Sequence, residues 1–166
     1  YPPVSDADLA VLRRQLGRPA RGVLGIAARC VCGNPTVVAT APRLPDGTPF
    51  PTFYYLTHPA ATAAMSALEA GHVMPELLAE MEADPELISA YRRAHEQYLA
   101  DRAQFGEVPE IAGISAGGMP TRVKCLHALA AHALAAGPGV NPVGDAALSR
   151  AAWSSEVCAC PPEESG

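Results

Sequence analysis

Lysine, aromatic side chains and long apolar runs are all scarce in this chain of 166 residues. Lys124 is the only lysine, and aromatic residues make up 5% of the sequence. No apolar run approaches the roughly 20 residues that a membrane-spanning helix needs, so no membrane association is expected. The chain also begins without the pattern of a secretory signal peptide. These absences favour a soluble, cytoplasmic protein.

Positive charge is in short supply as well. The sequence has 12 Lys and Arg residues against 17 Asp and Glu residues, which gives a formal net charge of −5. A protein that binds nucleic acid by neutralising many phosphates needs a broad basic surface. The charge balance therefore excludes a broad nucleic-acid surface and leaves room only for a small basic pocket. The sequence identifies no protein partner.

The length and the 49% hydrophobic content are sufficient for one domain with its own core. We expect a single α+β domain over residues 1–153 and a C-terminal tail over 154–166. Segments rich in β-forming residues and separated by turn formers predict a small three-stranded antiparallel sheet, packed on one side with about five helices. The expected strands are 23–29, 36–40 and 52–57. The expected helices are 8–16, 59–69, 76–83, 84–104 and 120–136, with a short last helix at 146–153.

Five cysteines, an odd number in a chain of this length, argue against a disulfide framework. They favour metal binding, catalysis or reduced thiols. Cys30 and Cys32 lie in the expected turn between the first two strands. In an up-down-up sheet the first and third strands end at the same edge, so His58 is expected near both cysteines. Cys158 and Cys160 repeat the spacing in the tail, where we expect them to be incidental.

The second group of chemically active residues follows the glycine pair Gly117-Gly118. Cys125 would complete a four-ligand site with Cys30, Cys32 and His58. Three thiolates and an imidazole suit zinc or a 4Fe-4S cluster. The alternative is that Cys30 and Cys32 are small turn residues and Cys125 is a buried helix cysteine.

The neighbours of Cys125 suggest further roles. If Pro120 opens the helix, Arg122 and Lys124 lie in its first turn, where two cations and free backbone amides can bind a phosphate or carboxylate. Two ordinary surface charges are the alternative. His127 is two residues from Cys125 and faces away from it, and His132 is two turns along. Both histidines are therefore expected around the site rather than as ligands.

A thiol-dependent enzyme is the alternative function. Cys125 would be the nucleophile, because a helix N-terminus and an adjacent lysine both lower the pKa of a thiol. His58 or His127 would then serve as the base. A redox disulfide between Cys30 and Cys32 is less favoured, because the one-residue spacer strains the bridge.

Several short motifs, taken together, resemble the bacterial domain-of-unknown-function family numbered 501, over about residues 9–153. They are Gly17-Arg18-Pro19, Arg21-Gly22-Val23, Cys30-Val31-Cys32-Gly33, the segment 42–52, Tyr55-Leu56-Thr57-His58-Pro59, Arg122-Val123-Lys124-Cys125-Leu126-His127 and the segment 139–145.

This resemblance implies no established activity. The family is best known from actinobacteria, and the position of His58 can be cysteine in other members, as a metal ligand would tolerate. Genes of this family often lie beside septum-formation and phosphatase genes, and the resemblance therefore implies a third alternative, a partner-binding scaffold linked to cell division. The leading hypothesis is a metal-binding protein of unknown biochemical activity, with a possible anion pocket beside the metal.

Overall fold

A three-stranded antiparallel sheet with the order β1-β2-β3 forms the centre of the fold, and the computed structural model describes residues 1–162. The strands are β1 (Val23–Arg29), β2 (Pro35–Thr40) and β3 (Tyr54–Leu56). Val38 of β2 pairs with Ile26 on one side and Tyr55 on the other. This confirms the expected α+β class and up-down-up order. Of the expected tail, residues 163–166 lie outside the described part.

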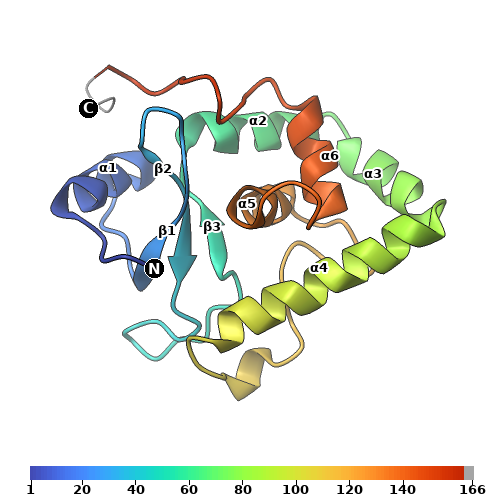
Figure 1. Cartoon of the computed structure of the whole chain (residues 1–166), viewed down its shortest axis with the longest axis horizontal. Helices are drawn as coiled ribbons and strands as arrows, with labels where there is room; N and C mark the ends of the chain where they lie inside the picture. Colours follow the sequence, from blue (N-terminus) through green and yellow to red (C-terminus); the bar gives the residue numbers. More distant parts are fainter. Residues whose placement is uncertain (163–166) are drawn as a thin grey trace.

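Helices cover both faces of this sheet (Figure 1). The helix α1 (Asp6–Leu16) lies on one side of it, and α5 (Leu126–Ala136) lies on the other. The expectation that all helices pack on one side was therefore wrong. The reason lies in β2, which is buried at every position and carries apolar side chains on both faces, Val37 and Ala39 on one and Val38 on the other, so each face needs cover.

The other helices surround α5 on its side of the sheet (Figure 1). Three of them begin where the sequence supplies a capping side chain followed by proline: His58 accepts from Ala61 N, Asp84 from Glu86 N, and Asn141 from Gly144 N. The Asn141 cap starts the last helix four residues before the expected position. These elements are α2 (Pro59–Ala70), α3 (Val73–Glu82), α4 (Pro85–Ala103), the 3-10 helix η1 (Pro109–Ile111) and α6 (Pro142–Arg150).

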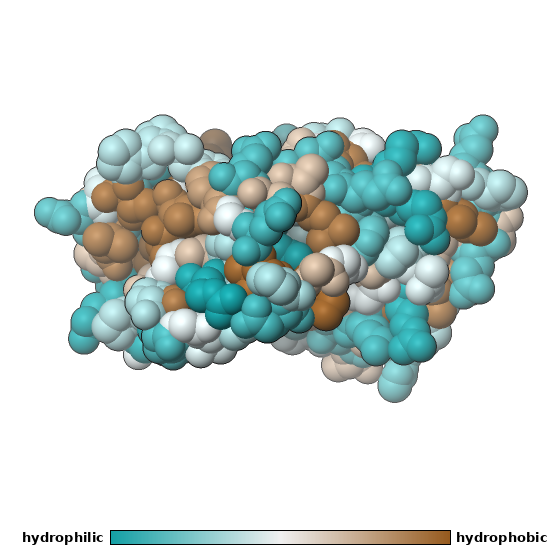
Figure 2. All heavy atoms as spheres, turned by 90° about the horizontal axis from the view of Figure 1, so that it is seen from below, coloured by the Kyte–Doolittle hydropathy of each residue, from teal (hydrophilic) through white to brown (hydrophobic). Residues whose placement is uncertain are grey.

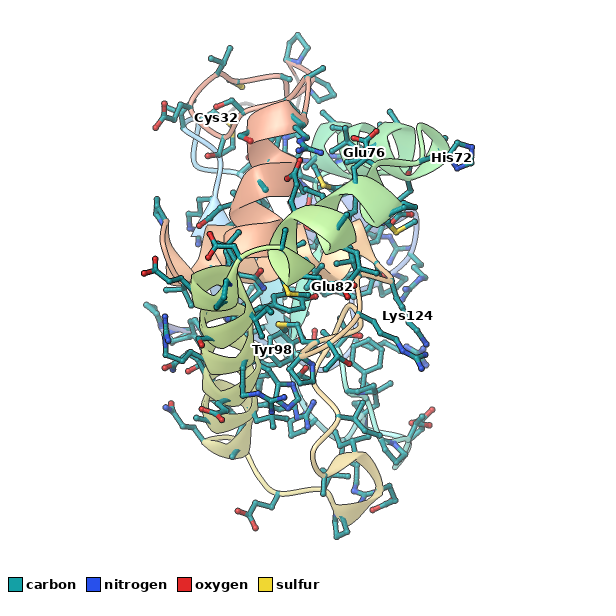
Figure 3. The ribbon with its side chains drawn as sticks, turned by 90° about the vertical axis from the view of Figure 1, so that its right-hand side faces the viewer. Cys32, His72, Glu76, Glu82, Tyr98 and Lys124 are labelled. Carbon is teal, nitrogen blue, oxygen red and sulfur yellow. The ribbon has the colours of Figure 1, made fainter. Side chains whose placement is uncertain are left out.

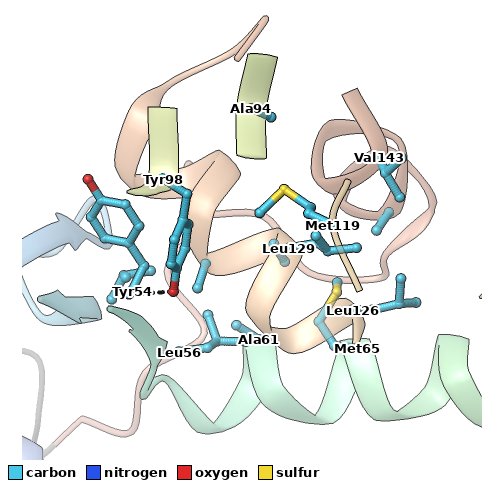
Figure 4. Packing of buried hydrophobic residues seen from close by; sticks show 14 of the residues in the cluster. Tyr54, Leu56, Ala61, Met65, Ala94, Tyr98, Met119, Leu126, Leu129 and Val143 are labelled. Carbon is cyan, nitrogen blue, oxygen red and sulfur yellow. Dashed lines mark hydrogen bonds between the residues drawn. The ribbon is translucent and has the colours of Figure 1, made fainter. Parts of the chain in front are cut away.

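The core lies between α5, β3 and the surrounding helices (Figure 4). Leu126 and Leu129 of α5 are fully buried there, together with Met65 of α2. The hydroxyl of Tyr98 accepts a hydrogen bond from the backbone amide of Tyr54, at 3.1 Å. This bond joins α4 to the edge strand of the sheet.

His132 belongs to this core. Its ring stacks on Tyr54 with centroids 5.5 Å apart, and Asn141 Nδ2 donates to its Nδ1 at 3.1 Å. Burial lowers the pKa of His132 to about 4. Its Nε2 has no hydrogen-bond partner among the described residues. His132 is therefore a neutral packing residue.

The helix expected at 120–136 begins only at Leu126. The residues before it form turns, in which Arg122 N donates to Gly118 O at 2.8 Å and Lys124 N donates to Gly117 O at 2.7 Å. Gly118 has a φ of +96°, and a Cβ there would lie 2.8 Å from Arg122 O. The glycine pair therefore permits a tight loop at the place where a helix beginning at Pro120 was expected.

The surface seen from below carries hydrophobic areas separated by hydrophilic ones (Figure 2). Phe105, just after α4, is half-exposed, and its ring stacks on that of Tyr1 at 6.0 Å. Among the described residues, no helix combines the length and the apolar character needed to cross a membrane.

Candidate metal centre

The turn between β1 and β2 holds the first two cysteines. Gly33 N donates to Cys30 O, and Cys30 N donates to Asn34 O, both at 2.8 Å. Gly33 has a φ of +95°, a conformation that glycine adopts without strain. Cys30 is buried, and Cys32 is partly exposed. The turn therefore fixes two thiols at one end of the sheet.

The C-terminal segment, residues 154–162, lies against this turn. Val31 N donates to Ser155 O at 2.9 Å, which ties the two segments together. The Sγ atoms of Cys30, Cys32, Cys158 and Cys160 all lie within 4.8 Å of one another. The Sγ atoms of Cys32 and Cys160 are 3.6 Å apart. The second cysteine pair is thus part of the cluster, and its repeated Cys-x-Cys spacing was the signal that could have indicated this.

His58 lies beside the same cluster. Its Nε2 is 3.1 Å from Cys160 Sγ, and its Nδ1 accepts from Ala61 N at 3.4 Å. Only 2% of the residue is exposed, and its ring is 5.4 Å from that of Trp153. The fold therefore brings His58, Cys30 and Cys32 to one edge of the sheet.

The surroundings of Cys160 disfavour a lone thiolate. Partial burial raises the pKa of the Cys160 thiol to about 12; the amide of Asn34 opposes this rise, and the neighbouring cysteines add to it. Asn34 Nδ2 is buried and makes no hydrogen bond of ordinary geometry within residues 1–162. Four crowded thiols can lose their protons together only if a cation balances the charge.

The spacing of the sulfur atoms suits such a cation. Four sulfurs about 2.3 Å from a zinc ion lie about 3.8 Å from one another at the corners of a tetrahedron. The 3.6 Å between Cys32 and Cys160 is close to that edge. The cysteine cluster therefore has a geometry that can hold a metal ion.

Cys125 is not part of this cluster. It is the N-cap residue of α5 and falls in a second group, with Glu69 at the end of α2 and His127. Figure 3 shows Cys32 at the top of the molecule and Lys124, the neighbour of Cys125, far from it. The expected four-ligand set therefore separates: Cys125 is held elsewhere because the loop after Gly118 delivers it to the end of α2.

Arg122 and Lys124 are both exposed, in the loop before α5. Their backbone amides are already used by Gly118 O and Gly117 O. The first amide of α5, Leu126 N, donates to Glu69 Oε2 at 2.9 Å. The chain's own carboxylate thus takes the place that an external anion was expected to fill, and only the two side chains remain for an anion pocket.

The match to a known family covers residues 26–149. It includes Cys30, Cys32, His58 and Cys125, and it ends before Cys158 and Cys160. No curated protein and no solved structure gives a match. Because the family model spans most of the sequence, this chain belongs to DUF501, a family of proteins of unknown function.

Proposed function

We propose that this protein binds one zinc ion through Cys30, Cys32, Cys158 and Cys160, and that the ion fastens the C-terminal segment to the turn between β1 and β2. The observation that supports this proposal is the cluster of four Sγ atoms, all within 4.8 Å of one another. Four thiolates are a common ligand set for structural zinc.

His58 acts in this proposal as a hydrogen-bond donor and not as a ligand. Its Nδ1 accepts a hydrogen bond from Ala61 N at the start of α2, so that nitrogen carries no proton. In the neutral ring the proton then lies on Nε2, which points at Cys160 Sγ from 3.1 Å. A protonated nitrogen cannot coordinate a metal, but it can donate to a bound thiolate and stabilise its charge.

The compact spacing favours a single ion over a 4Fe-4S cluster. In a cluster of this kind each cysteine binds a different iron atom, which separates the sulfurs more widely than four ligands of one ion. The 3.6 Å between Cys32 and Cys160 fits the single ion. A set of four thiolates also leaves no open coordination position, so the ion would be structural rather than catalytic.

Metal analysis of the full chain tests this function. Protein purified anaerobically should contain about one tightly held zinc and little iron, without the broad absorbance of an iron–sulfur cluster in the visible range. The variant Cys158→Ser/Cys160→Ser should lose this zinc, and the matched variant Cys125→Ser should keep it. Tightly bound zinc that persists in the double variant, or stoichiometric iron in the wild type, would overturn the proposal.

A further inference from the structure

We propose a second metal site, formed by Glu69, Cys125 and His127, which binds a divalent transition-metal ion such as zinc and keeps one coordination position open. The three candidate ligand atoms lie within 4.8 Å of one another. They come from the end of α2 and the start of α5, on segments separate from the four-cysteine cluster. The two proposals therefore share no residue.

The orientation of His127 is the main support for this site. Its Nε2 is 3.2 Å from the backbone carbonyl of Thr62 and 3.0 Å from Ser66 Oγ. A carbonyl only accepts hydrogen bonds, so Nε2 carries the proton in the neutral ring. Metal-binding histidines are commonly held in this way, with one nitrogen donating to a carbonyl and the other free to bind.

The free nitrogen, Nδ1, faces two other ligand atoms. It is 3.2 Å from Glu69 Oε2 and 4.0 Å from Cys125 Sγ. A lone pair and a carboxylate oxygen at this distance repel each other unless a proton on Nδ1 or a metal ion lies between them. Around a tetrahedral zinc ion, a nitrogen and an oxygen are about 3.4 Å apart, and a nitrogen and a sulfur are about 3.6 Å apart. The separations of 3.2 Å and 4.0 Å are close to these values, and all three atoms lie within 4.8 Å of one another.

The remaining contact of Glu69 orients its carboxylate toward this ion. Glu69 Oε2 accepts from Leu126 N at 2.9 Å, which holds the carboxylate at the start of α5. The side chains of His127 and Glu69 are 27% and 25% exposed, so solvent reaches the site. Three protein ligands with solvent access leave a fourth position for water or a small anion, as in zinc sites that activate water. Lys124 and Arg122 lie one and three residues before Cys125 in the sequence, and both are exposed.

Cobalt(II) titration of the purified full chain tests this site, because tetrahedral cobalt with a thiolate ligand absorbs visible light. We expect the wild type to bind about one equivalent of cobalt while its tightly held zinc stays in place. Cys125→Ser and His127→Gln should weaken cobalt binding by more than the roughly 10- to 100-fold typical of losing an outer hydrogen-bond partner of a metal ligand. Glu69→Gln should also weaken it, yet its amide oxygen can still accept from Leu126 N and preserve the fold.

His72→Asn is the control, because His72 is an exposed histidine outside the site and asparagine tolerates its left-handed backbone. This control and Cys158→Ser/Cys160→Ser should bind cobalt here as the wild type does. No cobalt binding by the folded wild type would overturn the proposal and leave an ion pair between His127 and Glu69. If folded Cys125→Ser and His127→Gln bound cobalt as tightly as the wild type does, the proposal would be overturned as well. If the wild type held no zinc at the four cysteines but still bound cobalt at Glu69, Cys125 and His127, only the first site would be contradicted.

Discussion

Cys32 and Cys160 are 128 positions apart in the chain, yet their Sγ atoms lie 3.6 Å from each other. This contact joins the C-terminal segment to the turn at the end of the sheet. His58 adds the start of α2 to the same point, through its 3.1 Å approach to Cys160. A metal ion held there would fasten the C-terminal segment, which contains no helix or strand among the described residues, to this end of the sheet.

Metal removal should therefore destabilise the protein. An ion that binds only the folded state contributes about 4 kcal/mol when its free concentration is 1,000 times its dissociation constant. For a chain of this size that corresponds to a fall in melting temperature on the order of 10 °C. Thermal unfolding with and without a strong zinc chelator measures this fall in melting temperature. The variant Cys158→Ser/Cys160→Ser should melt lower than the wild type and should no longer respond to the chelator. A chelator effect of equal size in both proteins would contradict the account.

Two substitutions of His58 distinguish a donor from a ligand. His58→Asn keeps an acceptor for Ala61 N but loses the donor that reaches Cys160, whereas His58→Gln can still present an amide donor near the position of Nε2. We expect both variants to keep about one zinc, and His58→Asn to bind it about 10- to 100-fold more weakly. Competition with a coloured chelator gives the affinities, and Cys30→Ser provides the comparison. If His58→Asn lost zinc as completely as Cys30→Ser, His58 would be a ligand.

Buried His132 should make the protein acid-sensitive. Its folded pKa of about 4 lies below the ordinary value of 6.5, so between these two pH values the unfolded chain binds a proton that the folded chain does not. The free energy of unfolding should therefore fall by roughly 3 kcal/mol as the pH drops from above 6.5 to about 4.

The control for this effect is His132→Gln, which can still accept from Asn141 Nδ2 but does not titrate. The cysteine centre also responds to acid, so the informative quantity is the difference between wild type and variant. Urea unfolding at pH 7.5 and pH 5 should show a smaller pH effect in the variant. An identical pH effect in the two proteins would contradict a neutral buried His132.

Close packing of α5 against α6 should make Gly144 intolerant of a side chain. A Cβ at this position would be forced against the backbone carbonyl of Leu129 and would lie 2.9 Å from the Cβ of Ala133. Gly144→Ala should lower the free energy of unfolding by about 1–3 kcal/mol or more, because the two helices must separate. Ser149→Ala, on the exposed side of the same helix, should change it by less than about 0.5 kcal/mol. Urea unfolding of both variants compares their free energies of unfolding. Equal stability of the two variants would contradict the account.

Much of the fold was predictable because its signals are local. β-forming residues between turn formers indicated the three strands, and Pro59 and Pro85 marked two helix starts. The up-down-up order of the strands also predicted that His58 lies near Cys30, because strands of one sheet that run in the same direction end at the same edge. Each of these inferences uses residues that are close in sequence or neighbours in one sheet.

The errors concern contacts that no local pattern encodes. Pro120 resembled the first residue of a helix, but the turns formed by Gly117 and Gly118 delay α5 to Leu126 and carry Cys125 to Glu69. The approach of Cys160 to Cys32 depends on how a segment without helix or strand folds back over the sheet. Its proline- and glutamate-rich neighbours suggested a tail, and only the three-dimensional structure shows where it lies.

X-ray absorption at the zinc edge tests the central claim most directly. The sample is the full-length Cys125→Ser variant, in which the proposed second site has lost its sulfur and weakly held metal has been removed by dialysis. The account predicts about one zinc per chain, surrounded by four sulfur atoms at about 2.3 Å. A folded protein without zinc, or a zinc ion with fewer than four sulfur ligands, would contradict it.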